Sequence, residues 1–221
     1  MKKIFATLLA ASLMFAATDA FAQLYVGLGY NYTDEKSVYQ KDDNDPVITK
    51  TPLNGFYAGA SYNIPIPAVN GLGITPGVYA SFLLGKQHVD GVSAFGVTII
   101  PGGNYKYKEF AIDVPIHANY SLALSGDTKF FVYGGPKFQY ALSNKTEYAT
   151  DGSSDYSTTD NLKGNSANRN PFNLYLGGGV GAQVAQFQII LGYDFSLLNI
   201  STKDNTTASR GQLKIGVAYA L

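Results

Sequence analysis

Apolar and polar residues alternate along the middle of the chain. Between residues 109 and 122 every second residue is apolar: Phe110, Ile112, Val114, Ile116, Ala118, Tyr120 and Leu122. The residues between them include Glu109, Asp113, His117 and Asn119. A period of two places the two sets on opposite faces of one β-strand. The segment is about twice as long as a usual strand of a soluble protein, so it predicts a long strand with one apolar and one polar face.

Similar alternation recurs along the chain and predicts eight β-strands, at Gln23–Tyr32, Leu53–Ile64, Leu72–Gln87, Tyr105–Leu122, Lys129–Leu142, Pro171–Val184, Phe187–Leu198 and Arg210–Leu221. Three connections are short: Pro65–Gly71, Ala123–Thr128 and Ala185–Gln186. Four are long and polar: Thr33–Pro52, His88–Asn104, Ser143–Asn170 and Asn199–Ser209. Short turns at one end and long loops at the other are typical of outer-membrane barrels. The predicted fold class is all-β, an eight-stranded antiparallel up-and-down transmembrane β-barrel.

Aromatic residues lie at both ends of the predicted apolar faces. Near the short turns these are Tyr62, Tyr120, Phe130, Phe187 and Tyr219. Near the long loops they are Tyr30, Phe56, Phe82, Phe110, Tyr140, Phe172 and Phe195. Ten residues of a strand tilted by about 45° climb about 23 Å, close to the roughly 25 Å height of a lipid-facing band. The pattern therefore predicts two aromatic girdles that border lipid.

The opposite faces carry polar residues, tyrosines and many glycines, and they predict the barrel interior. Eight strands enclose a lumen just wide enough for side chains to fill, so we expect a side-chain-filled lumen and not an open pore. Six charged residues fall on this face: Glu109, Asp113, Lys137, Asp194, Arg210 and Lys214. In a low-dielectric interior they are expected to pair with one another, and a proton or ion path is the alternative interpretation.

Three prolines interrupt the strand patterns, at Pro76, Pro115 and Pro136. A proline cannot donate to a ladder and is usually confined to sheet edges or bulges. Because a closed barrel has no edge, we expect local β-bulges at these positions.

The N-terminal residues have the three parts of a secretory signal peptide. Lys2 and Lys3 precede an almost wholly apolar run, Ile4–Ala17, and small residues at Ala20 and Ala22 mark a cleavage site. The run is too short to span a membrane as a helix. We therefore expect a signal peptide at residues 1–22 and an outer-membrane β-barrel domain at residues 23–221.

Composition narrows the function classes. The absence of cysteine excludes disulfides, thiol catalysis and a lipid-modified N-terminal cysteine. The 16 basic and 16 acidic residues balance, so no nucleic-acid partner is expected.

The last residues of the chain form a recognisable pattern. Lys214, Gly216, Tyr219 and Leu221 occupy the polar, glycine, aromatic and terminal apolar positions of a strand that resembles the C-terminal targeting strand of outer-membrane barrels. The usual final Phe is Leu here. The resemblance implies recognition of this strand by the barrel-assembly machinery.

The middle of the chain carries a second resemblance. The paired segments 110–120 and 130–140, with Val114-Pro115-Ile116 and Gly134-Gly135-Pro136 inside them, resemble the small outer-membrane β-barrel domain family. That family includes the OmpA/OmpX-type and PorT-like barrels. The resemblance implies an integral barrel in the bacterial outer membrane, and it leaves the role open because members of the family differ widely.

Few residues are candidates for chemistry. A lipid-modifying enzyme needs a Ser–His pair on the lipid-facing wall near the outer leaflet. His117 is placed on the inward face, and His88 has Ser93 as its nearest serine. The run Asp42-Asp43-Asn44-Asp45 lacks the spacing of a defined calcium loop. We therefore expect no catalytic, cofactor-binding or metal-binding site.

These observations predict a non-enzymatic outer-membrane barrel with a structural or surface-interaction role. Its expected partners are outer-membrane lipids and lipopolysaccharide, the assembly machinery, and surface partners that contact the outer loops. The apolar loop Gly91–Gly102 could extend a hairpin or fold into the barrel mouth. Alternatives are a narrow channel, a PorT-like secretion or assembly component, a lipid-modifying enzyme, and a soluble periplasmic barrel.

Overall fold

The computed structural model describes residues 23–40, 45–94, 97–100, 102–164 and 167–221. The predicted signal peptide lies outside the described residues, as do Asp42, Asp43 and Asn44. No helix among the described residues is long and apolar enough to cross a membrane.

Eight antiparallel strands close into a barrel: β1 (Gln23–Tyr39), β2 (Val47–Pro65), β3 (Leu72–Val89), β6 (Gly103–Ser125), β7 (Thr128–Thr150), β9 (Phe172–Val184), β10 (Phe187–Ser196) and β11 (Thr206–Ala220). Neighbours along the chain pair with each other, and β1 pairs with β11 to complete the ring. The predicted fold class is confirmed.

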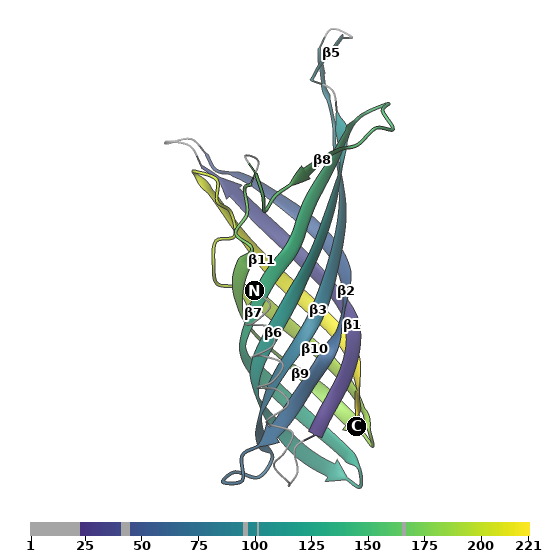
Figure 1. The fold of residues 1–221 in the computed structure, drawn as a ribbon, viewed down its shortest axis with the longest axis vertical. Helices are drawn as coiled ribbons and strands as arrows, with labels where there is room; N and C mark the ends of the chain where they lie inside the picture. Colours follow the sequence, from purple (N-terminus) through teal and green to yellow (C-terminus); the bar gives the residue numbers. More distant parts are fainter. Residues whose placement is uncertain (1–22, 41–44, 95–96, 101, 165–166) are drawn as a thin grey trace.

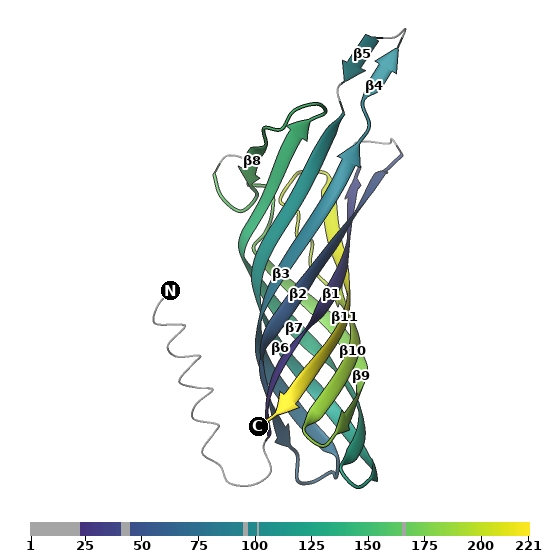
Figure 2. The same cartoon turned by 90° about the vertical axis from the view of Figure 1, so that its right-hand side faces the viewer.

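The three remaining strands lie at the long-loop end of the barrel. The short strand β8 (Ser157–Asp160) pairs with the far end of β7, and β4 (Val92–Ala94) pairs with β5 (Val97–Ile100) in a separate hairpin. This hairpin projects away from the barrel, whereas the short turns and the C-terminus lie at the opposite end (Figures 1 and 2). The apolar loop therefore extends a hairpin and does not fold into the mouth.

The strands are longer than predicted at the long-loop end. β1 continues to Tyr39 instead of ending at Tyr32, β2 begins at Val47, and β7 continues to Thr150. In these extensions both faces carry polar residues, so the alternation of apolar and polar residues fades while the backbone ladder continues. The sequence pattern located the strands only where one face is apolar.

The barrel has polar side chains inside and apolar side chains outside, which is the reverse of a soluble protein. On β10, Asp194 is fully buried while its neighbours Tyr193 and Phe195 are 53% and 45% exposed. The same alternation along the other strands leaves a continuous band of exposed apolar side chains around the outside. Burial of charge inside and exposure of apolar side chains outside is the arrangement expected of a barrel surrounded by lipid.

The predicted aromatic residues lie on this outer wall, with Tyr62, which is half-buried, as the exception. Near the long loops, Tyr30, Phe56, Phe82 and Phe110 are direct cross-strand partners on β1, β2, β3 and β6. Near the short turns, the rings of Phe187 and Tyr219 pack edge to face with centroids 5.2 Å apart. Cross-strand aromatic contacts of this kind stabilise neighbouring strands.

The prolines inside the strands do not form the predicted bulges. The register is unchanged across Pro76, Pro115 and Pro136, and the shifts of the β6–β7 ladder lie elsewhere. The ladders omit pairs beside the prolines: between β6 and β7, pairing stops at Pro115 and resumes at Ala118. Because proline lacks an amide hydrogen, the strands lose hydrogen bonds locally while they keep their register.

Candidate functional site

Two groups of buried charges and one cavity divide the barrel interior. We call Glu35, Glu109, Arg169 and Arg210 the outer ion cluster, because they lie toward the long loops. Arg210 joins β11 to both β1 and β6: its Nε donates to Glu35 Oε2 at 2.9 Å, and its Nη1 and Nη2 donate to the two Glu109 carboxylate oxygens at 2.6 and 2.8 Å. Arg169, from the loop before β9, also pairs with Glu35.

The outer ion cluster is neutral and closely packed. Glu35, Glu109 and Arg210 are each 5% exposed, and Asn144 donates to Glu109 at 2.5 Å. A bidentate Arg–carboxylate pair is among the strongest side-chain hydrogen bonds. Two voids that border these residues measure about 10 Å³ each. The cluster therefore joins β1, β6, β11 and the loop before β9 inside the barrel near the long loops.

A central ion cluster, formed by Lys137, Lys214 and Asp194, lies below it. The ammonium groups of Lys137 and Lys214 are 2.7 and 2.5 Å from the same oxygen, Asp194 Oδ2. Lys137 also donates to Gln212 and lies 4.1 Å from the centre of the Tyr175 ring. Because two cations share one carboxylate, the cluster carries one positive charge more than its own acid can balance.

A neighbouring hydrogen-bond chain completes this layer. Gln139 donates to Asp113 at 2.7 Å, and the Tyr175 hydroxyl donates to Gln139 at 3.1 Å. Tyr175 is fully buried. These hydrogen bonds link Tyr175 on β9 through Gln139 on β7 to Asp113 on β6.

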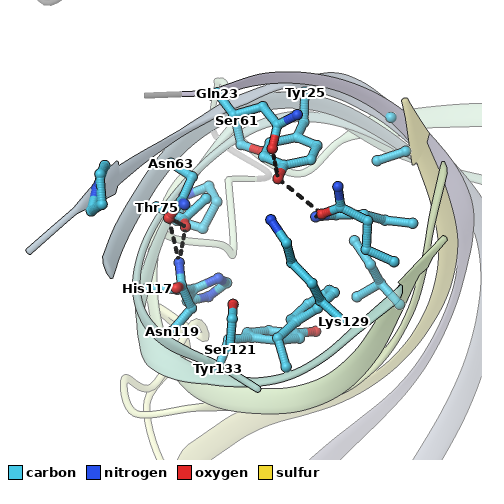
Figure 3. A pocket seen from close by; sticks show the side chains of 18 of the residues that line it. Gln23, Tyr25, Ser61, Asn63, Thr75, His117, Asn119, Ser121, Lys129 and Tyr133 are labelled. Atoms are coloured by element: carbon cyan, nitrogen blue, oxygen red, sulfur yellow. Dashed lines mark hydrogen bonds between the residues drawn. The ribbon is translucent and has the colours of Figure 1, made fainter. Parts of the chain in front are cut away.

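A cavity of about 650 Å³ occupies the short-turn half of the lumen. We call it the turn-side cavity. Its walls carry amides, hydroxyls and rings that point toward one another (Figure 3), including Gln23, Tyr25, Ser61, Asn63, Thr75, His117, Asn119, Ser121 and Tyr133. Three lysines line it, Lys129, Lys137 and Lys214, together with the carboxylate of Asp113. The expectation of a lumen filled along its whole length is wrong for this half.

Glycines make room for the rings that border the cavity. A Cβ atom at Gly29 or Gly216 would overlap the Tyr57 ring, and one at Gly179 or Gly192 would overlap Tyr133. The rings of Tyr57 and Tyr133 therefore lie close against the backbone of the inner wall. Rings held against the wall leave space in the centre of this half, whereas Arg210 and the carboxylates that it contacts reach across the other half.

The structure brings the predicted interior charges together. Glu109 and Arg210 join the outer ion cluster, and the other four lie in or beside the central cluster. Sequence reasoning missed Glu35 and Arg169, because both were placed in loops. The alternation Asn31, Thr33, Glu35 continues past the predicted end of the strand and could have located Glu35. No comparable signal marks Arg169.

The histidines lie far from each other. His117 faces the turn-side cavity, where its ring lies 4.9 Å from that of Tyr133. His88, at the long-loop end of β3, is 3.2 Å from both Asn104 and Asp90. Within the part of the chain that the structure describes, no group of three or more His, Cys, Asp or Glu residues could hold a metal ion.

The outer wall carries a second candidate site beyond the aromatic row. Six lysines occupy outward positions on five neighbouring strands: Lys36, Lys50, Lys86, Lys106, Lys108 and Lys145. We call them the lysine collar. They face each other in direct cross-strand pairs, Lys36 with Lys50, Lys86 with Lys106 and Lys108 with Lys145. Like charges directly opposite each other destabilise a sheet.

Some of this charge is offset locally. Lys108 pairs with Glu147 at 2.5 Å, Asp160 lies opposite Lys145, and Lys106 lies 3.6 Å from the centre of the Tyr156 ring. Lys36, Lys50 and Lys86 have no ion-pair partner among the described residues. The collar therefore has a net positive charge that the protein itself does not neutralise.

A family model described as an outer membrane protein beta-barrel domain matches residues 19–202. The chain belongs to this family. Membership places the protein in the bacterial outer membrane, with the short turns toward the periplasm and the long loops outside. The turn-side cavity of this family member therefore opens toward the periplasm, and the lysine collar lies at the outer surface of the membrane.

Solved structures with a similar fold are also outer-membrane barrels. Ail, the attachment invasion locus protein of Yersinia pestis, is 15% identical, with 91% of this chain and 100% of that chain covered and a TM-score of 0.40. A major outer membrane protein from Thermus thermophilus is 14% identical, with 87% of this chain and 99% of that chain covered and a TM-score of 0.37. No curated protein matches the chain.

Proposed function

We propose that this outer-membrane barrel has a surface-interaction role, in which the lysine collar binds phosphate groups of lipopolysaccharide. The observation that carries the proposal is the set of like-charged cross-strand pairs above the aromatic row. Lysines directly opposite each other destabilise the sheet when no anion is bound. Anions that bind to these lysines form charge-assisted hydrogen bonds and make the arrangement favourable. Its position beside the lipid-facing band matches the level of lipid head groups.

The lysines of the collar that lack an ion-pair partner support the choice of a membrane-bound anion. Lys36, Lys50 and Lys86 point outward from the wall, toward the space that neighbouring lipids occupy. A lysine near an anionic membrane surface contributes about 1 kcal/mol. The collar covers β1, β2, β3, β6 and β7, so lipopolysaccharide molecules on one side of the barrel would contact it.

A double variant tests the proposal. In Lys50→Gln/Lys86→Gln, we expect lipopolysaccharide to stabilise the barrel by about 2 kcal/mol less than in the unmodified protein, because two phosphate contacts are lost. The free energy of unfolding is measured by urea titration in vesicles with and without lipopolysaccharide. The matched control is Lys163→Gln/Lys203→Gln, which removes the same charge from exposed loops. Equal loss of lipopolysaccharide-dependent stability in both double variants would contradict the proposal.

We further propose that the lumen is closed to ions and that the protein has no catalytic role. The two buried ion clusters and the voids of about 10 Å³ around the outer one support closure. His117 faces the lumen, away from lipid, and His88 contacts amide and carboxylate oxygens. Loss of an exported cargo on gene deletion would instead support a PorT-like secretion role.

Export and assembly complete the proposal. Residues 1–22 are proposed as the signal peptide, residues 23–221 as the barrel domain, and the C-terminal strand as the segment that the assembly machinery recognises. Tyr219 and Leu221 are exposed on the outer wall. The assembly machinery can therefore contact them before the barrel is surrounded by lipid. Lys214 and Gly216 face inward and have structural roles in the finished barrel. The outer loops, including the β4–β5 hairpin, are proposed as contacts for surface partners.

A further inference from the structure

We propose that the turn-side cavity is a binding site for a small organic anion, with a carboxylate or a phosphate group, that enters from the periplasm. The volume of about 650 Å³ lies within the range of roughly 300–1,000 Å³ that is usual for small-molecule sites. The site is separate from the lysine collar, and its test does not depend on lipopolysaccharide.

Charge gives the first reason for an anion. Three ammonium groups line the cavity, on Lys129, Lys137 and Lys214, and Asp113 is the carboxylate among the lining residues. Asp194 pairs with both Lys137 and Lys214, so three positive charges face two negative ones. Asp113 is already engaged as a hydrogen-bond acceptor for Gln139. The cavity walls therefore carry a net positive charge, and a low-dielectric enclosure strengthens its attraction for an anion.

Unused donors give the second reason. Lys129 has no ion-pair or hydrogen-bond partner among the described residues, and its side chain extends from β7 into the middle of the ring of lining residues (Figure 3). Lys214 has Asp194 as its one partner in that same set, although an ammonium group has three donors. His117 Nε2 is buried without a partner among those residues. The two ammonium groups can donate hydrogen bonds to an oxyanion, and His117 Nε2 can donate one when it carries a ring proton.

The polar wall beside these groups suits the organic part of such a ligand. Asn119 Nδ2 donates to Asn63 Oδ1 at 2.8 Å, and the Tyr25 hydroxyl donates to Gln23 at 2.7 Å. These bonds hold the amide and phenol groups in place around the cavity (Figure 3). Ordered polar groups bind a ligand with less loss of conformational entropy than mobile ones.

The closed inner end makes the cavity a site for binding and not for passage. The central ion cluster and the buried ring of Tyr175 lie beyond it, and the outer ion cluster lies further along. A ligand that enters from the periplasmic mouth meets Lys129 first and Lys214 at the far end. The two lysines are therefore expected to bracket an elongated anion.

Binding is tested on the refolded barrel in zwitterionic detergent by isothermal titration calorimetry. The probes are succinate and inorganic phosphate, with glucose as the uncharged probe. We expect one or both anions to bind, glucose not to bind, and Lys129→Gln to weaken anion binding by about tenfold, as loss of a charged hydrogen bond implies. Lys203→Gln, in an exposed loop, serves as the control of equal charge.

The two anion probes separate the possible chemistries. Tighter binding of succinate assigns the site to carboxylates, and tighter binding of phosphate assigns it to phosphate esters. Unchanged anion binding in Lys129→Gln, equal weakening in Lys203→Gln, or no anion binding at all would overturn the proposal. Lys214→Gln gives a second measurement from the inner end. Should that variant fail to fold, Lys129→Gln still decides the question, because Lys129 is exposed and supports no other residue among those described.

Discussion

At the scale of single residues, the barrel has buried ion pairs in its lumen and an exposed ion pair on its outer wall. Arg210 contacts two carboxylates from two other strands and is 5% exposed. Lys108 and Glu147 form an ion pair as well, but the lysine is 44% exposed. The two arrangements should differ greatly in their contribution to stability, because water screens the exposed pair and cannot replace the buried one.

Removal of Arg210 should therefore destabilise the barrel strongly. Arg210→Gln leaves Glu35 and Glu109 buried with Arg169 as the remaining cation of the cluster, and we expect a loss of about 3–5 kcal/mol. Lys108→Gln, the matched control, should cost about 0–1 kcal/mol. Urea titrations in vesicles without lipopolysaccharide measure both. Similar losses in the two variants would mean that the outer ion cluster contributes no more than a surface pair.

At the scale of the strand, an arginine should cost more stability on the outer face of β6 than on its inner face. Ile116 is 42% exposed on the lipid-facing wall between Phe110 and Tyr120, whereas the next residue, His117, lines the turn-side cavity. Ile116→Arg should cost about 2–4 kcal/mol, because it places a charge in the middle of the lipid band. His117→Arg should cost less, since its charge meets a polar cavity. Refolding yield and urea titration compare the two variants, and equal costs would contradict the assignment of Ile116 to lipid and His117 to the lumen.

The strands also show what the sequence pattern could and could not predict. Lys137, Asp194 and Lys214 were placed inside because each lies between apolar residues that face lipid. Glu35 was missed because the apolar half of the alternation ends at Tyr32 while pairing continues to Tyr39. Arg169 reaches the lumen from a loop, whose course depends on tertiary contacts such as its bridge to Ser201. The turn-side cavity was missed because periodicity gives facing and says nothing of how far each side chain extends.

At the scale of the whole molecule, the two halves of the lumen differ in how their side chains are arranged. Side chains that cross it, from Glu35, Glu109 and Arg210 through to Lys137 and Asp194, join strands that are distant in sequence. Rings that lie flat against glycines, as Tyr57 and Tyr133 do, leave the periplasmic half open. This difference between the two halves is the basis for the proposal that the lumen is closed to ions.

This division predicts an electrically silent barrel. An ion that crosses would have to displace the outer ion cluster, where voids measure about 10 Å³ and the carboxylates are already bound by arginine. Purified protein in planar bilayers should therefore give no steady current at any protein concentration. Heat-dependent gel mobility of protein recovered from the same lipid shows that folded barrel is present. Absence of current is then not due to absence of folded protein. A steady current that rises with the amount of folded protein would contradict closure, and a narrow channel through the ion clusters would then replace the closed lumen.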